Sequence, residues 1–580
     1  MISLSYLNKI LLFITFFILM NFNFAIAEDE PADIWKNEVN NQQEDELDNN
    51  ENLKIESPIL SDDTNKATIE ISEDIIKDDN KPLIGIFDPQ ENNLNLNMWA
   101  NTDGEEIKKV FNRINKLKLS TVAEDLLFQV LFTNAYAPGQ NLNSEEFTKI
   151  KVNWLIKKKR IDDLEVLLKN NSEVRQNSTA IKFLINEYLS SADIKSACDK
   201  MSFLDSKIRN RYLEKFTIYC LINNDRKEEA QLIFDLLLET GLKDKFFEDK
   251  INYLLGFKQK ANQTVVDNNL FNFYLYQITA EDFDYKPNEK TDKYIWRYLS
   301  SSNLIQINDF EDEKVILTYE KAAAEDSFKS EEIFNIYKQI LFSVNQLINV
   351  LEVYKNLPSY KARALVYQSI LLSDNIEKKL NLIFLLKDLF DKDKLTNVYS
   401  KELARILRNI DPNQIPESYE EIVEVSIEAD FKDKKKIKFD NDILHRSKII
   451  KHFLEDNNKI NKTEKDFKSV YKKIKRNKKY FISIKDIIVL ESLVVDGLSL
   501  PNDLNFDELS SELTVPKNLQ DLVSKNQMGL VMLKIIEIIG EDDIPNLDPE
   551  TIYFLNKILN ELNLKKIRND ILSKALPVRV

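Results

Sequence analysis

The sequence predicts an all-α protein, built as an irregular α-solenoid of helical hairpins. Glycine and proline are scarce, with 8 and 14 residues in a chain of 580. Turns between strands consume these two residue types, so a strand-rich fold is disfavoured. Apolar residues also recur at helical spacing along most of the chain after residue 82, and this periodicity is the main sign of amphipathic helices.

The first 27 residues have the pattern of a secretory signal peptide. Lys9 precedes the apolar run Ile10–Met20, and Ala25-Ile26-Ala27 supplies the small residues that a signal peptidase recognises. The run is shorter than the ~20 residues of a spanning helix. We therefore expect cleavage after Ala27 and export to the periplasm, with no integral membrane segment in the mature chain.

A strongly acidic segment follows the signal peptide and reaches residue 81. Between Glu28 and Asn80 there are 18 Asp and Glu residues against 4 Lys. Its sparse apolar residues cannot bury enough surface to offset the entropy of ordering, so 28–81 is predicted to be disordered.

The remainder divides at polar loops into three helical regions. We expect an N-terminal helical-repeat domain over 82–300, continuing repeats over 301–411 and a C-terminal helical domain over 412–580. The last boundary lies at Asp411–Pro416, where two prolines interrupt the helical pattern.

The clearest hairpin spans Ser206–Gly241. Asp225 is predicted to cap its second helix, with Glu228 three residues later at capping-box spacing. Gly241 is predicted to be the left-handed residue that ends this helix. The length of the pair is close to the ~34 residues of tetratricopeptide units, to which the chain has a weak general similarity.

Further helices follow from periodicity and capping residues. Ser330–Asn356, Tyr360–Lys378 and Lys379–Asn409 are predicted to be successive amphipathic helices. Asn526–Gly540 is predicted to be a buried helix, and Asp548 should cap the next one, with a proline in its first turn.

One stretch of the C-terminal region is strongly basic. Residues 432–485 contain 19 Lys and Arg against 7 Asp and Glu, within a chain of net charge −16. Such a stretch could bind an anionic surface of the cell envelope, although a solvated helical face is the simpler interpretation. Nucleic acid is not an expected partner of an exported protein.

The two cysteines, Cys198 and Cys220, are predicted to form a disulfide. Each lies on the apolar face of one of two successive helices, and an exported chain meets oxidising conditions. Two buried thiols are the alternative.

Motifs of common enzyme classes are missing from the sequence. It contains no phosphate-binding glycine loop and no zinc or nucleophile-elbow motif. His445 and His452, the only histidines, are expected to be solvated surface residues rather than a metal pair. We therefore assign no catalytic, metal-binding or cofactor-binding residue.

Two further patterns are compatible with binding or catalysis but have simpler interpretations. Glu491-Ser492 matches the dipeptide of periplasmic glycan lyases without the flanking residues of those enzymes. Trp99, Trp154 and Trp296 would form a binding trio only if they converged in space, and are otherwise core anchors.

Several features together resemble a family of exported helical proteins of alphaproteobacteria. They are the signal peptide, the acidic spacer, the segment GIFDPQENNLNLNMW at 85–99, the cysteine pair and the ending LPVRV. The similarity covers 83–256 and 500–580. Some members carry an antifreeze-glycopeptide-like label that reflects Ala/Pro-rich composition, which this chain lacks. The resemblance implies an envelope location and a paired cysteine, and assigns no catalytic residue.

These observations favour a non-enzymatic interaction or scaffold protein of the bacterial envelope. It would bind another envelope protein through its helical-repeat surface and need no cofactor. One alternative is a cell-wall or polysaccharide-acting enzyme with paired carboxylates among its 96 acidic residues. A second is an envelope protein that binds an anionic surface through 432–485.

Overall fold

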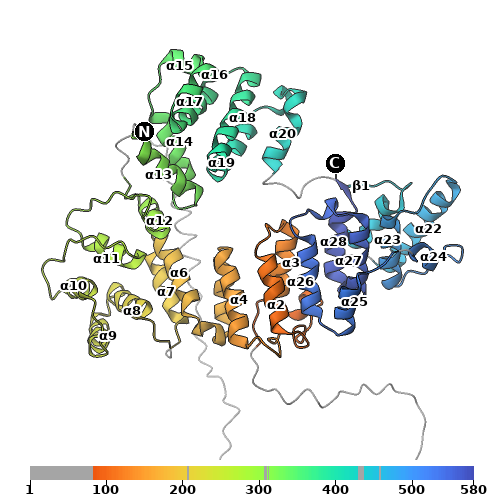
Figure 1. Ribbon diagram of the computed structural model, residues 1–580, viewed down its shortest axis with the longest axis horizontal. Coiled ribbons are helices and arrows are strands. Elements are labelled where there is room, and N and C mark those ends of the chain that lie inside the picture. Colours follow the sequence, from red (N-terminus) through yellow and green to blue (C-terminus); the bar gives the residue numbers. More distant parts are fainter. Residues whose placement is uncertain are drawn as a thin grey trace, which may run out of the picture. The chain divides into compact units, whose positions relative to one another are not determined.

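A computed structural model describes residues 83–580, except 206–207, 306–309, 311, 429–436, 456–458, 512 and 580. Helices are almost the only regular secondary structure in this part of the chain (Figure 1), which confirms the all-α fold. The signal peptide and the predicted disordered segment 28–81 lie outside the described residues.

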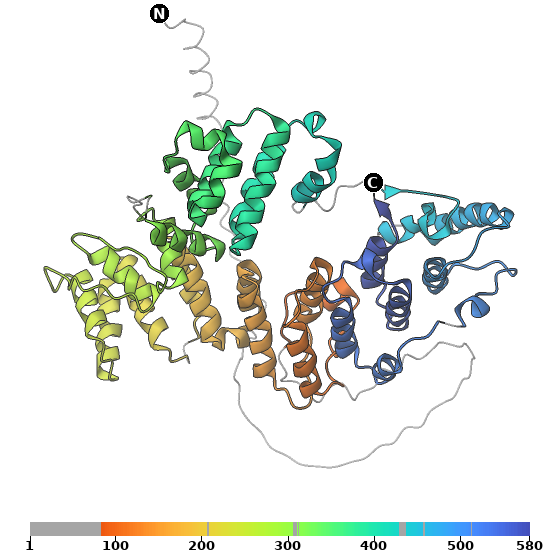
Figure 2. The same ribbon diagram turned by 45° about the horizontal axis from the view of Figure 1, so that its top comes forward.

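Many of the helices follow one another through short turns, and longer connections lie on either side of α11 and between α23 and α24 (Figure 2). The first group comprises α2 (Gly104–Ile114), α3 (Thr121–Phe132), α4 (Ser144–Lys157), α5 (Ile161–Asn170), α6 (Ser178–Ser190), α7 (Ile194–Asp199), α8 (Arg211–Asn223), α9 (Lys227–Glu239), α10 (Lys245–Leu254), α11 (Leu270–Thr279) and α12 (Lys293–Ser301). The middle group comprises α13 (Glu313–Ala324), α14 (Ser330–Gln339), α15 (Val344–Ile348), α16 (Val350–Val353), α17 (Ser359–Leu372), α18 (Ile376–Lys392), α19 (Thr396–Arg408) and α20 (Glu417–Glu428). The last group comprises β1 (Ile437–Lys438), α21 (Lys451–Leu454), α22 (Ile460–Arg476), α23 (Ile484–Val495), α24 (Phe506–Ser510), α25 (Lys517–Ser524), α26 (Met528–Ile539), α27 (Pro549–Glu561), α28 (Lys565–Ala575) and β2 (Val578–Arg579).

One type of turn recurs between helices. A residue with positive φ follows the helix end, its N–H bonds to the carbonyl three residues back, and the next N–H bonds to the carbonyl five residues back. This is the Schellman arrangement, which pairs the last carbonyls of a helix. Glycine occupies the left-handed position at Gly241, Gly256 and Gly497, but other residues occupy it at Lys159, Ala192, Asp225, Asn303, Asp326, Lys394, Asn526 and Asn563.

This turn confirms one predicted helix end and corrects one predicted helix start. Gly241 ends α9 with φ of 89°, as expected. Asp225, however, does not cap α9. It has φ of 60° and belongs to the turn that ends α8, while Arg226 is the residue before α9 and makes no side-chain cap.

None of the three helices predicted in the middle group has the expected bounds. The stretch Tyr360–Lys378 contains most of α17 and the start of α18, which begins at Ile376. The stretch Ser330–Asn356 is broken after α14, because Ser343 forms a capping box with Gln346 and starts a new helix there. The stretch Lys379–Asn409 contains parts of two helices, α18 and α19, separated by the turn at Lys394.

The largest hydrophobic core joins the N-terminal and C-terminal helices. We call it the N–C core; it contains buried side chains from 84–184 and from 444–576. Helix α26, predicted as buried, packs against both α2 and α3 (Figure 1). The sequence-based limits at 300 and 411 stay predictions, but this core is shared by the first and third of those regions.

Helix α26 is tied to the N-terminal region at both of its ends. At its start, the N–H of Gly529 donates to the carbonyl of Met98 at 2.8 Å. At its end, the carbonyl of Gly540 accepts from the N–H of Ser120 at 2.9 Å. The ring of Trp99 is fully buried against Gly529, where a Cβ atom would lie 2.3 Å from ring atom Cε3. Only glycine fits this contact.

Two extended segments complete the N–C core. Ile84 and Phe87 form isolated bridges with Ala135 and Thr133, just beyond α3. The fully buried Lys151 donates to the carbonyl of Ile84, and burial lowers the pKa of its ammonium to about 7. Near the C-terminal end, Val578 and Arg579 of the LPVRV ending form β2, which pairs antiparallel with β1 of the basic stretch.

The second core, which we call the disulfide core, is formed by side chains from α6 to α12. The structure joins Cys198 of α7 and Cys220 of α8 in the predicted disulfide, with their Cα atoms 5.5 Å apart. Both cysteines are buried among apolar side chains. The bond therefore links two successive helical hairpins.

The third core, the arginine core, extends from α12 to α20. Arg363 of α17 is fully buried, and its guanidinium contacts Glu320, Tyr337 and Asp393. These partners come from α13, α14 and the turn after α18. Removing one member of such a buried network leaves an uncompensated charge, so the network enforces one arrangement of these helices.

We expect Gly529→Ala to destabilise the N–C core by about 1–3 kcal/mol, because the added methyl group overlaps the Trp99 ring. Urea unfolding measures the change. Gly139→Ala is the control, since its Cβ would meet only the Ala100 carbonyl oxygen, at 3.2 Å. Equal effects of the two substitutions would contradict this interpretation.

Loss of the disulfide should destabilise the chain by roughly 3 kcal/mol, given its separation of 22 residues. Thermal unfolding with and without dithiothreitol checks this. The Cys198→Ser/Cys220→Ser double variant should melt at the lower temperature and be insensitive to the reductant. A wild-type melting curve unaffected by complete reduction would disprove the expectation.

Candidate functional site

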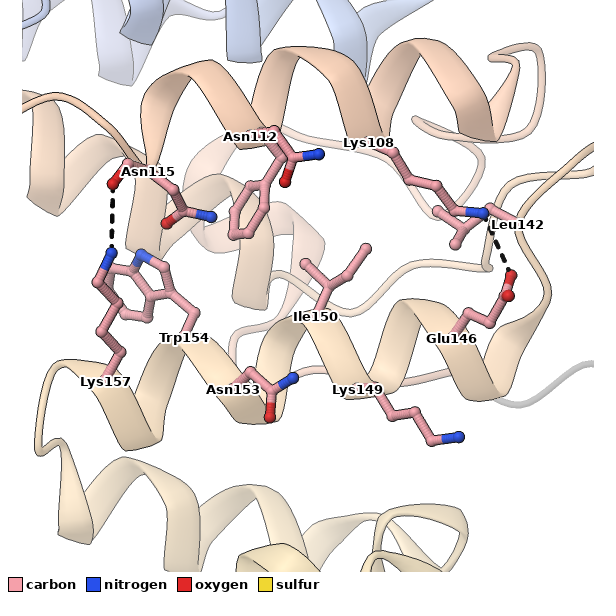
Figure 3. Close-up of a pocket in the computed structure, with 11 residues that line it drawn as sticks. Lys108, Asn112, Asn115, Leu142, Glu146, Lys149, Ile150, Asn153, Trp154 and Lys157 are labelled. Atoms are coloured by element: carbon pink, nitrogen blue, oxygen red, sulfur yellow. Dashed lines mark hydrogen bonds and ion pairs between the residues drawn. The ribbon is translucent and has the colours of Figure 1, made fainter.

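An open groove lies between α2 and α4 and has a volume of about 470 Å³ (Figure 3). Both helices begin at well-defined caps. The Asp103 side chain caps α2, and Asn143 forms a capping box with Glu146 at the start of α4. The caps fix where each helix begins, and so which side chains face the groove.

The groove floor is apolar and its rim is polar. Phe111 of α2, Leu142, and Ile150 and Trp154 of α4 supply the apolar lining. Trp154 itself is 2% exposed and stacks on Phe128, with ring centroids 5.8 Å apart. Because the floor belongs to the N–C core, it is held rigidly from below.

Polar contacts bridge the two helices at each end of the groove. At one end Lys108 Nζ lies 3.5 Å from Glu146 Oε2. At the other end Lys157 Nζ donates to the backbone carbonyl of Asn115 at 3.2 Å. Figure 3 shows both contacts crossing from one helix to the other. They define the length of the groove.

Three carboxamides lie along the rim between these contacts. Asn112 is on α2, Asn115 is the C-cap residue directly after α2, and Asn153 is on α4. Within the described part of the chain, none of the three side chains makes a hydrogen bond. A carboxamide offers both donors and an acceptor, so these groups are available to a ligand.

Most of the charges beside the groove are paired. Lys108 lies 3.1 Å from Glu105 and 3.5 Å from Glu146, and Lys149 lies 2.7 Å from Glu145. A hydrogen bond to Glu105 raises the pKa of Lys108, and a hydrogen bond to Glu145 raises that of Lys149. Lys157 also lines the groove and has no acidic partner within the described part of the chain.

Two further hollows adjoin the groove along the N-terminal half of α4. One, of about 470 Å³, is lined by residues from 137 to 146, and the other, of about 600 Å³, by residues from 143 to 179. Asn143 and Ser144 border both hollows. The surface around α4 thus offers a succession of depressions rather than a single closed chamber, which suits an extended ligand better than a compact one.

The two histidines are not solvated, contrary to the sequence prediction. His445 Nδ1 lies 2.7 Å from Asp486 Oδ1, and its side chain is 12% exposed. His452 is buried, with Nδ1 3.1 Å from Thr463 Oγ1 and Nε2 2.8 Å from Asp496 Oδ2. Each histidine has its own carboxylate from a distant part of the chain, so the two do not form a pair.

Ser483, His445 and Asp486 are close together but do not form a nucleophilic triad. The Ser483 hydroxyl lies 3.3 Å from His445 Nδ1, the same ring nitrogen that contacts Asp486. A triad needs the hydroxyl and the carboxylate on opposite ring nitrogens. Asp486 is instead the third residue of α23 and completes its capping box with Ser483.

Asp496 is the centre of a buried charge network. Its carboxylate accepts from His452 and from Arg568 Nη2, the latter at 2.7 Å, and lies 3.3 Å from Lys565 Nζ. Burial opposes ionisation, but the hydrogen bonds of His452 and Arg568 outweigh it and lower the pKa of Asp496 far below its ordinary value. The network joins α21, α23 and α28.

The other residues considered from the sequence have structural roles. Ser492 is buried and donates to Asn556 Oδ1 at 2.8 Å, which packs α23 on α27. Burial raises the pKa of its neighbour Glu491. Trp99 and Trp154 belong to the N–C core and Trp296 to the arginine core. The three tryptophans therefore do not share one site.

Neither a membrane-spanning helix nor a metal-binding cluster is present among the described residues. No helix among them is both long and apolar enough to span a bilayer. Within the same residues, no cluster of histidine, cysteine and acidic side chains has the geometry of a metal site.

Fold and groove together define a helical-hairpin repeat protein with an open, amide-lined depression. Comparison with protein-family models, curated proteins and solved structures finds no match to this chain. Its function is therefore argued from its own residues.

We expect Asp496→Asn to lower the free energy of unfolding at pH 7 by about 3–5 kcal/mol, because it leaves Arg568 buried without its countercharge. The folded-state pKa of Asp496 lies below its unfolded value, near 4. Its stabilisation is complete above pH ~4 and is lost as the pH falls through the folded pKa. The difference between wild type and variant should therefore shrink in strong acid.

Urea titrations between pH 7 and pH 2 measure this difference. Asp503→Asn is the matched control, since its exposed ion pair with Lys475 should contribute less than about 1 kcal/mol. A stability difference that does not change with pH would contradict the assigned role of Asp496.

Proposed function

We propose that this chain is an exported binding protein of the bacterial envelope that holds an extended segment of a partner protein in the α2–α4 groove. The main support for this proposal is the row of three carboxamides, Asn112, Asn115 and Asn153, which make no hydrogen bond within the described residues and lie above an apolar floor. An extended backbone presents N–H and C=O groups that such amides can pair, while apolar pockets accept its side chains.

The dimensions and charge of the groove support this proposal. Its volume falls in the range of specific ligand sites, ~300–1,000 Å³, and the adjoining hollows extend it along α4. Lys157, which has no acidic partner within the described residues, can pair with an acidic group or a carbonyl of the bound segment. The ligand would be bound between rigid helices, so little ordering of the protein is needed.

Three observations support export as part of the proposal. Residues 1–27 have the pattern of a signal peptide, and Cys198 and Cys220 form a disulfide. Disulfides persist in oxidising compartments such as the periplasm. The resemblance to exported helical proteins of alphaproteobacteria has the same implication, and we include membership of that group in the proposal.

Selection from a displayed library of random 12-residue peptides tests the groove directly. The wild-type chain should enrich peptides that bind with measurable affinity. Asn112→Ala/Asn115→Ala/Asn153→Ala should weaken their binding at least about tenfold, since each substitution removes a hydrogen-bonding group. Fluorescence anisotropy of labelled peptides gives the dissociation constants.

The control variant removes carboxamides elsewhere on the surface. Gln231→Ala/Asn518→Ala/Gln520→Ala changes exposed residues of α9 and α25 and should leave affinity unchanged. Failure to enrich any peptide, or equal affinity of both triple variants, would overturn the proposal. Release of soluble fragments from purified peptidoglycan would favour the polysaccharide-acting enzyme instead.

A further inference from the structure

The basic stretch contains an exposed row of cations on helix α22. Thr463, Phe467, Val470 and Ile474 form its buried face and pack into the N–C core. Lys465, Lys472 and Arg476 lie on the opposite face, at spacings of seven and four residues. We call these three residues the α22 ridge.

The ridge is positive because its charges are not neutralised locally. Neighbouring lysines of α22 do have acidic partners, for example Lys468 with Glu464, Lys473 with Asp442 and Lys475 with Asp503. The three ridge residues have no acidic partner within the described part of the chain. The cations at the sides of α22 are paired and those on its exposed face are not. The positive potential is therefore strongest on the exposed face.

A rigid turn adjoins the C-terminal end of the ridge. Lys478 and Lys479 are exposed in it, and the Phe481 side chain is 84% exposed. Between them, Tyr480 points inward and donates to Asp486 Oδ2 at 2.9 Å. The Tyr480 N–H also donates to the carbonyl of Asn477. These contacts fix the turn and hold Phe481 in solvent.

An exposed aromatic ring beside unpaired cations is a combination that suits binding to an anionic lipid surface. A single exposed apolar side chain is common on protein surfaces, but Phe481 follows closely after Lys478 and Lys479 in the chain, so the same turn presents both an apolar ring and cations. At a lipid interface, cations pair with anionic headgroups while an adjacent apolar ring inserts among the acyl chains. Both features then have a partner.

We infer that the α22 ridge and the Phe481 turn dock this protein on an anionic lipid surface. The contact is peripheral, since the apolar face of α22 stays in the core and only one ring inserts. It is electrostatic in origin and therefore weakened by salt. This surface is separate from the α2–α4 groove, and the inference does not rest on the peptide-binding proposal.

Cosedimentation with lipid vesicles tests the inference. The chain is used from Glu28 onward, so that the apolar leader cannot insert. It should bind vesicles of equal parts phosphatidylglycerol and phosphatidylcholine, and not vesicles of phosphatidylcholine alone. Raising sodium chloride from 50 to 500 mM should release it.

Substitutions then locate the contact. Lys465→Gln/Lys472→Gln/Arg476→Gln should lower the partition coefficient about 100-fold, given the usual contribution of each cation near such a surface. Phe481→Ser should lower it several-fold and leave its salt dependence unchanged. Circular dichroism confirms that each variant keeps its helix content.

Two control variants make the test specific. Lys378→Gln/Lys392→Gln/Lys401→Gln removes three exposed lysines of α18 and α19 and should not change binding. Val344→Ser/Ile348→Ser removes an exposed apolar pair of α15 and should also have no effect. Absence of binding to anionic vesicles, equal binding to neutral ones, or loss of binding only in a control variant would overturn the inference.

Discussion

The architecture depends on one requirement, the pairing of the last carbonyls of each helix while the chain reverses direction. The same Schellman turn satisfies this requirement at many helix ends. Its left-handed residue is a glycine at Gly241, Gly256 and Gly497 and another residue type elsewhere. A left-handed conformation costs a residue with a side chain roughly 1–2 kcal/mol. With so few glycines available, the chain accepts this cost to keep its turns short. Short turns make successive helices antiparallel neighbours, and the disulfide and arginine cores are built from such neighbours. The N–C core also needs segments that are far apart in the chain.

Local rules of sequence predicted the fold where a single signal governs a position. Gly241 and Asp548 lie where a helix ends or begins, and each was recognised by residue type and context. The prediction for Asp225 was wrong because it stands between two helix signals, and the end of α8 prevails over the start of α9. The break before α15 was missed because apolar residues continue through it. In retrospect Ser343 and Gln346 mark it at capping-box spacing.

The sites were less predictable because they depend on contacts between distant segments. The groove residues Asn112, Asn115 and Asn153 give no signal in a sequence rich in asparagine, and only the packing of α2 beside α4 brings them together. The burial of His452 could not be predicted either, since Asp496 lies 44 residues away. Cys198 and Cys220 were predictable because the chain holds two cysteines on adjacent apolar helix faces.

The shared N–C core also determines the order in which the chain can mature. The Gln527 side chain at the start of α26 donates to the carbonyl of Asn101, 426 residues earlier. Until α26 has been synthesised, the apolar faces of α2 and α3 that pack against it stay exposed. Contacts between residues so far apart in the sequence also form slowly. The earliest helices are therefore exposed to aggregation for the longest time. The N–C core can therefore close only after α26 has been synthesised, whereas the disulfide core is built from residues of one continuous stretch.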